Sequence, residues 1–132
     1  MKGLLTFTFL LLMMSCASQK TDVTYEAMTR GSSKKLIVVG NQLSYATNQK
    51  QKIVTISSEN LKKLNEIISK ITLEEMKDLE APTKERLHDG ALHATVTVKQ
   101  GGKEYISSTF DDGHPPAELK PLVDLLMSFI KE

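Results

Sequence analysis

The sequence of 132 residues contains no tryptophan and a single cysteine, and aromatic residues make up only 5% of it. With so few aromatic side chains to stack on bases, a platform for single-stranded nucleic acid is not expected. The formal net charge of +1 argues against any dedicated nucleic-acid binder. One cysteine cannot form an intrachain disulfide, so the folded domain must be held together by its hydrophobic core.

The chain also lacks the short motifs that accompany common enzyme chemistries. No serine stands in a Gly-x-Ser-x-Gly motif, no His-Glu-x-x-His occurs, and no glycine-rich phosphate loop precedes a helix. A carboxylate pair for glycoside chemistry could be drawn from Asp111 and Glu118, but any acidic loop would permit such a choice. We therefore expect a non-enzymatic protein that needs no cofactor.

Residues 1–15 have the pattern of a secretory signal peptide. Lys2 supplies the initial charge, and residues 4–14 are apolar apart from two threonines, a run too short to span a bilayer as a stable helix. The run ends at residues 12–16, Leu-Met-Met-Ser-Cys, which resemble the bacterial lipobox. The resemblance implies cleavage before Cys16 and diacylation of its thiol. A plain signal peptide cut nearby, or a free or intermolecularly paired thiol, are the alternatives.

Lipidation would anchor the mature protein durably on a membrane of the bacterial cell envelope, because two or three acyl chains suffice for stable attachment. Ala17, in place of Asp after the cysteine, resembles lipoproteins sorted to an outer membrane, which implies a domain facing the periplasm. Residues 16–22 are expected to form the lipidated N-terminus and a short polar tether. Residues 23–132 are long enough for a single domain. The expected partners are the membrane, through the lipid, and another envelope protein.

The first part of this domain has the alternating pattern of β-strands. Four strands are predicted, at residues 23–30, 35–39, 42–46 and 52–56. A tight turn at Gly40-Asn41 would place Val38 opposite Leu43 and Leu36 opposite Tyr45.

Helical spacing of apolar residues follows. It predicts a helix capped by Ser57 or Ser58, a shorter helix from Thr72, and a C-terminal helix from near Lys120.

A second pair of strands, at residues 91–98 and 104–110, is expected to form a hairpin at the centre of the sheet. A three-residue loop at 100–102 pairs Val96 with Ile106 and places both on a buried face. The predicted fold is therefore α+β, a mostly antiparallel sheet of about six strands in the order ββββ-α-α-ββ-α. Helices would cover one face of this sheet and leave the other face wet.

All three histidines lie between residues 88 and 114, with carboxylates close by. The candidate metal or ligand residues are His88, Asp89, His93, Asp111, Asp112 and His114. The open end of the predicted hairpin could bring them into one shell, with ligand types that suit zinc. In the alternative interpretation, Asp89-Gly90 and Asp112-Gly113 are ordinary turn dipeptides, and His114 before Pro115 suits an extended connection. Separately, Arg86 is expected to reach a carboxylate.

Two resemblances bear on function. Residues 81–91 and 110–116 resemble a small family of uncharacterised bacterial envelope lipoproteins, which implies no particular activity. A strand hairpin followed by Pro-x-x-Leu, at Pro116 to Leu119, and a terminal helix is similar to the emfourin family of small metalloprotease inhibitors.

The function that we expect is a lipid-anchored, non-enzymatic binding module that uses its polar sheet face or the His/Asp loops. The alternatives are a metal-binding protein or metal-dependent hydrolase, and a protease inhibitor of emfourin type.

Overall fold

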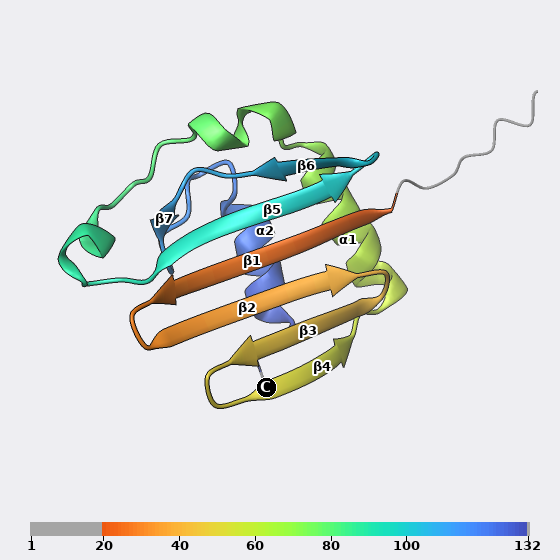
Figure 1. Cartoon of the computed structure of the whole chain (residues 1–132). Coiled ribbons are helices and arrows are strands. Elements are labelled where there is room, and N and C mark those ends of the chain that lie inside the picture. Colours follow the sequence, from red (N-terminus) through yellow and green to blue (C-terminus); the bar gives the residue numbers. More distant parts are fainter. Residues whose placement is uncertain (1–19, 132) are drawn as a thin grey trace, which may run out of the picture.

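Alternating apolar and polar residues at the start of the domain form a meander of four antiparallel strands. The computed structural model describes residues 20–131, and the meander opens this part of the chain (Figure 1). Its strands are β1 (Thr21–Thr29), β2 (Ser32–Val39), β3 (Gln42–Thr47) and β4 (Gln51–Thr55). The turn at Gly40 pairs Val38 with Leu43, which confirms the predicted hairpin. The predicted signal peptide and Cys16 lie outside the described residues.

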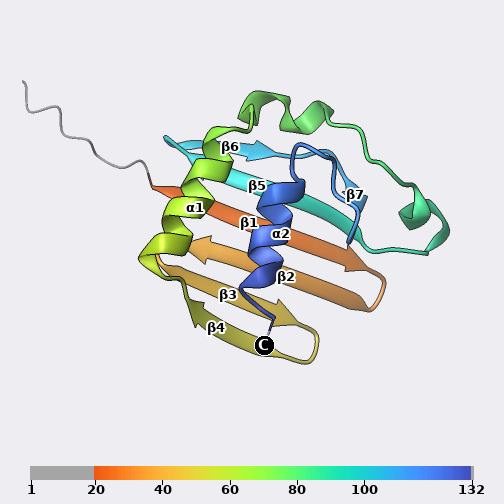
Figure 2. The ribbon, with the colours of Figure 1, turned by 180° about the vertical axis from the view of Figure 1, so that it is seen from behind.

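Two α-helices pack on one face of the sheet, and two 3-10 helices lie in the connections (Figure 2). In chain order the helices are α1 (Ser58–Ser69), η1 (Leu73–Asp78), η2 (Glu85–His88) and α2 (Lys120–Ser128). The Ser57 side chain accepts a hydrogen bond from the Asn60 N–H at 3.2 Å and caps α1. The helix predicted from Thr72 is only a 3-10 helix, and the Thr72 side chain makes no capping bond. Within residues 20–131, no helix is long and apolar enough to cross a membrane.

The fold is α+β, as predicted, but the second hairpin is not central to the sheet. Its strands are β5 (His93–Gln100) and β6 (Lys103–Ile106), and β7 (Phe110–Asp111) also pairs with β5. The strand order is β4-β3-β2-β1-β5-β6, so β6 lies at an edge and β1 and β2 occupy the middle. The expected central position was wrong. The four-stranded meander stays together, and β5 adds to the free side of β1, with Thr24 opposite Thr97, so that β6 becomes the last strand.

The register of the β5–β6 hairpin also differs from the prediction. Gly101 and Gly102 both have positive φ and form a two-residue turn, which pairs Thr97 with Ile106. Beyond the turn, the Ser107 hydroxyl accepts a hydrogen bond from the Val96 N–H at 2.9 Å, in place of a backbone carbonyl. The ladder then resumes two residues out of the predicted register, with Phe110 opposite Ala94. Ile106 is consequently 51% exposed instead of buried.

The core lies between the sheet and the two α-helices. The sheet contributes Tyr25, Leu36, Leu43, Val96, Val98 and Phe110, and the helices contribute Leu64, Ile68, Leu122, Val123 and Leu126, all of them buried. The rings of Tyr25 and Phe110 contact each other with centroids 6.2 Å apart. Side chains that alternate with these along the strands point to the opposite face, which neither α-helix covers (Figure 1).

Two neighbouring positions in β5 test this division of the sheet. Val96→Asp places an unpaired charge in the core and is expected to lower the free energy of unfolding by about 3 kcal/mol or more. Thr97→Asp, on the uncovered face between Thr24 and Ile106, is expected to cost about 1 kcal/mol or less. Urea midpoints of the two variants measure the difference. Equal losses would mean that both faces of β5 are covered.

Candidate functional site

The six residues that the sequence nominates lie at one end of the sheet, where β1 ends and β5 begins. His93 is the first residue of β5 and pairs with Asp111 of β7. Asp111 in turn forms an isolated bridge with His114, and the Asp112 N–H donates to the carbonyl of Leu92 at 3.0 Å. The fold therefore brings the backbones of the two predicted loops together.

The side chain of Asp111 is fully buried and holds the surrounding loops in place at this end of the sheet. Its carboxylate accepts hydrogen bonds from the Thr83 hydroxyl at 2.5 Å and from the Glu85 N–H at 2.7 Å. Arg86 donates both its backbone N–H and its guanidinium Nη1, each at 3.0 Å. Burial alone would raise the pKa of Asp111, but these donors together hold the pKa well below its usual range. The carboxylate thus fixes residues 83–86 against β7, and the predicted role of Arg86 is confirmed.

Asp112 points to the other side of the sheet from Asp111, because side chains alternate along the chain there. Its carboxylate accepts a short hydrogen bond from the Tyr25 hydroxyl and lies 2.8–2.9 Å from Lys34 Nζ. Burial raises the pKa of Tyr25 strongly, and the neighbouring Asp112 carboxylate raises it further by hydrogen bond and charge. Tyr25 therefore remains protonated and acts as a donor, and the two carboxylates serve separate contacts.

The other four candidates are exposed. His88 ends η2, and Asp89 takes the left-handed conformation with φ of 57°, which turns the chain back toward β5 as the sequence predicts. His93 and His114 are exposed as well. Among the residues that the structure describes, no three His, Cys, Asp or Glu side chains lie close enough together to hold a metal ion. The metal hypothesis stays a prediction, and these contacts give it no support.

A polar hollow of about 410 Å³ lies beside the Asp112–Lys34 pair, between the β1–β2 and β3–β4 turns. Asn48 joins these turns, since its amide donates to the Gly31 carbonyl at 2.7 Å. The amide oxygen of Asn48 accepts from the Ser33 N–H at 3.0 Å and from the Ser33 hydroxyl at 2.6 Å. Polar groups that line the hollow therefore bond to one another, and Asn48 holds the two turns together at this end of the sheet.

The face of the sheet opposite the α-helices has a different character, and we call it the open face. Among the described residues, five large hydrophobic side chains are exposed. Leu87 lies in η2, and the other four, Met28, Val39, Ile53 and Ile106, stand on the open face. Their positions follow from the alternation of buried and exposed residues along β1, β2, β4 and β6.

The strand registers align the open face into continuous rows. One row crosses six strands and reads, from β4 to β6, Ile53, Ser44, Ile37, Thr24, Thr97 and Ile106. The next row contains Glu26 opposite Lys35, whose charged atoms are 3.7 Å apart. The first row carries no charge, and half of its side chains are isoleucine. This row forms an uncharged band across the open face.

Sequence reasoning did not identify Lys34, Tyr25 or Thr83 as parts of the polar contacts. Tyr25 and Lys34 reach Asp112 across 87 and 78 residues of chain, so no local motif reveals the contact. For Arg86 the sequence predicts only a contact with some carboxylate, and the structure identifies this carboxylate as the buried Asp111.

Neither a family model nor a curated protein matches this chain. Its function is therefore inferred from its residues and their geometry.

The buried carboxylate predicts how stability depends on pH. Since the pKa of Asp111 is lower in the folded protein than in the unfolded chain, its ionised form stabilises the fold above about pH 4, and this contribution is lost as the pH falls further. Asp111→Asn is expected to lower the melting temperature at pH 7 and to flatten its fall between about pH 5 and pH 2. Asp124→Asn, which alters the exposed pair with Lys120, serves as the control. Parallel pH profiles for Asp111→Asn and the wild type would contradict this role.

Proposed function

We propose that the protein is a lipoprotein of the bacterial cell envelope whose domain binds another protein, without catalysis, through the open face. One observation carries the proposal: four of the five large exposed hydrophobic side chains in the described chain lie on this one face. Exposed apolar side chains that gather on one surface mark interaction sites. Two of the candidate carboxylates, those of Asp111 and Asp112, are by contrast already engaged by Arg86 and Lys34.

A protein partner suits the open face better than a small molecule does. Sites for small molecules are concave and enclose most of the ligand, whereas this row of side chains extends across six strands of one sheet. Protein interfaces combine an apolar centre with a polar rim. Here, the Ile37 row is flanked by the Glu26–Lys35 pair on one side. A protease inhibitor of emfourin type would be one form of such a module.

Attachment to the membrane completes the proposal. The lipobox pattern at residues 12–16 supports lipidation of Cys16, and Ala17 supports an outer-membrane location with the domain in the periplasm. A lipid anchor confines the domain to a surface and so raises its encounter rate with envelope proteins. The membrane is then the first partner of the protein, and an envelope protein is the second.

Lipidation is tested by replacing the cysteine. Cys16→Ser is expected to abolish partitioning of the protein into detergent, because no other residue of the chain can accept the thioether-linked lipid. Phase partitioning and mass spectrometry of the mature protein measure the effect. An unmodified Cys16 thiol in the mature wild-type protein would contradict the proposed anchor.

Binding through the open face is tested by photo-crosslinking in the producing cell. A benzophenone amino acid is placed at Ile37, in the middle of the open-face row, and in a second strain at Lys63, on the exposed side of α1. Adducts with another protein are expected to be at least tenfold more abundant from position 37 than from position 63. Equal yields from the two positions, or none from position 37, would contradict the proposed binding face.

A further inference from the structure

On the basis of the proposed binding function, we infer that the protein partner of the open face is a second copy of the same chain. The two open faces pack together around a two-fold axis that runs parallel to the strands and passes between β1 and β2, the two middle strands of the sheet. The pattern of side chains on the open face, its area, and the end of the sheet at which the proposed lipid anchor enters all favour this arrangement.

The uncharged row of the open face is complementary to itself about such an axis. A two-fold axis parallel to the strands reverses the strand order and keeps every row at its own height. β2 of one copy then faces β1 of the other, and β4 faces β6. Ile37 therefore faces Thr24 of the second copy, and Ile53 faces Ile106. The isoleucines at the two ends of the row, which are 69% and 51% exposed, cover each other.

The charged pair in the next row is also complementary to itself. Within one sheet, Glu26 lies opposite Lys35, and their charged atoms are 3.7 Å apart. Because β2 faces β1 of the second copy, Lys35 of each copy also lies against Glu26 of the other. The four side chains alternate in sign around the axis. Opposite charges across an interface favour association and fix its register.

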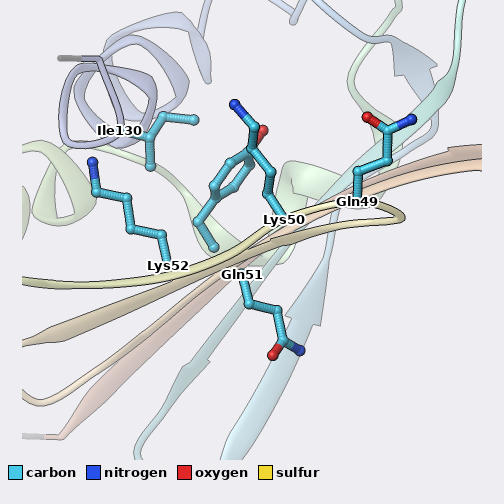
Figure 3. A pocket seen from close by; sticks show the side chains of 6 residues that line it. Gln49, Lys50, Gln51, Lys52 and Ile130 are labelled. Carbon is cyan, nitrogen blue, oxygen red and sulfur yellow. The ribbon is translucent and has the colours of Figure 1, made fainter.

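Among the described residues of this row, no other side chain is charged. The row continues to Thr95 on β5 and, in the other direction, through Ala46 to Gln51 on β4. Figure 3 shows Gln51 on one side of β4 and both Lys52 and Ile130 on the other side. Lys52 therefore belongs to the helix side of the sheet and takes no part in the contact between the two open faces.

The row on the other side of the uncharged one places no like charges against each other. Asp22, Lys99 and Glu104 are neighbours on β1, β5 and β6, and their charges alternate in sign. About the proposed axis, they face uncharged residues of β2, β3 and β4 in the second copy, namely Val39, Gln42 and Thr55. Both flanking rows are thus compatible with a second copy.

A two-fold axis perpendicular to the strands would give a less favourable contact between the same faces. Each strand would then face its own copy and run in the opposite direction. With the uncharged row at the centre, Glu26 of one copy would face Asp22 of the other, because these residues lie on either side of Thr24 on the same face of β1. Like charges that face each other across an interface oppose association.

The proposed lipid anchor selects the same axis. β1 begins at Thr21, five residues after Cys16, so each anchor enters at one end of its sheet. An axis parallel to the strands places both anchors at the same end, where both can insert into one membrane. A perpendicular axis would place them at opposite ends, about 30 Å apart. Anchoring of both copies in one membrane raises their effective concentration and favours pairing.

The open face is large enough for a specific contact, and no helix that the structure describes covers it (Figure 1). Six strands spaced by about 4.8 Å make it about 29 Å wide, and the side chains from Asp22 to Met28 on β1 span about 20 Å. Two such faces together bury on the order of 1,100 Å², which exceeds the area of about 1,000 Å² expected of a specific interface. Aligned sheets pack face to face in this way in β-sandwiches.

The test reverses each charge of the central pair in a separate variant of the full chain, purified in detergent. Glu26→Lys brings four lysines together around the axis, and Lys35→Glu brings four glutamates together. Each variant is expected to associate with itself at least tenfold more weakly than the wild type does. Energy transfer between copies labelled at the C-terminus measures association. Lys63→Glu, on the exposed side of α1, serves as the control and should associate as the wild type does.

Mixing the two variants separates loss of the contact from loss of the fold. In the mixture, one copy carries two lysines and the other carries two glutamates, so opposite charges again face each other across the axis. Association of the two variants with each other is expected to be within about threefold of the wild type. A monomeric wild type, self-association that neither variant weakens, or no recovery in the mixture would overturn the inference.

The mass of the photo-crosslinked adduct distinguishes this inference from the proposed function. Adducts of two identical chains, joined from position 37 to residues 22–26 of the second copy, would support both. Adducts with a different protein only would refute the second copy and leave the binding face intact. Recovery of association in the mixture without any adduct from position 37 would refute open-face binding in the cell but not the contact between copies.

Discussion

The pairing of β1 with β5 is the interaction that joins the two halves of the sheet into one domain. It joins the N-terminal meander to the C-terminal hairpin through a register that runs from Thr21 opposite Gln100 to Met28 opposite His93. Tyr25 and Val96 face each other in this pairing and are both fully buried beneath the helices. Because β1 and β5 are far apart in the sequence, their pairing closes a long loop. The chain entropy lost in this closure makes the pairing a costly step of folding. Once formed, it places β1 between two neighbours and leaves β4 and β6 as the edges.

The parts of the fold that could be predicted from sequence are those with local causes. The Gly40 turn, the Ser57 cap and the start of the C-terminal helix near Lys120 each depend on residues a few positions apart, and each is found as expected. The place of the second hairpin in the sheet has no local cause, because nothing near residue 93 in the sequence indicates that β1 returns to it. The register of β7 against β5 depends on a single hydroxyl, that of Ser107, which takes the place of a backbone acceptor beyond the Gly101-Gly102 turn. The use of a side-chain hydroxyl in place of a backbone acceptor can be recognised only once the positions of the two strands are known.

In the candidate site, the sequence likewise predicts which loops meet and does not predict how their side chains point. Sequence spacing correctly indicates that the two His/Asp loops meet at one end of the sheet. It does not indicate that Asp111 and Asp112 point to opposite sides, where Arg86 engages one and Lys34 engages the other. Buried carboxylates need donors on every side, and those donors come from distant strands and loops. Asp111 and Asp112 therefore stabilise the fold, while isoleucines and threonines form most of the uncharged row on the open face.

With the proposed lipid anchor at Cys16, the direction of β1 would limit how high above the membrane each part of the domain stands. β1 begins at Thr21, next to the proposed anchor, and runs for nine residues to the far end of the sheet, a length of about 30 Å at 3.3 Å per residue. The stretch from Cys16 to Thr21 can extend by no more than about 18 Å. The turn at Gly40 would thus stay close to the lipid headgroups, while the Asp112–Lys34 end would be the outermost part. The proposed lipoprotein would then meet partners that are themselves tethered to the same bilayer or that approach within roughly 50 Å of it.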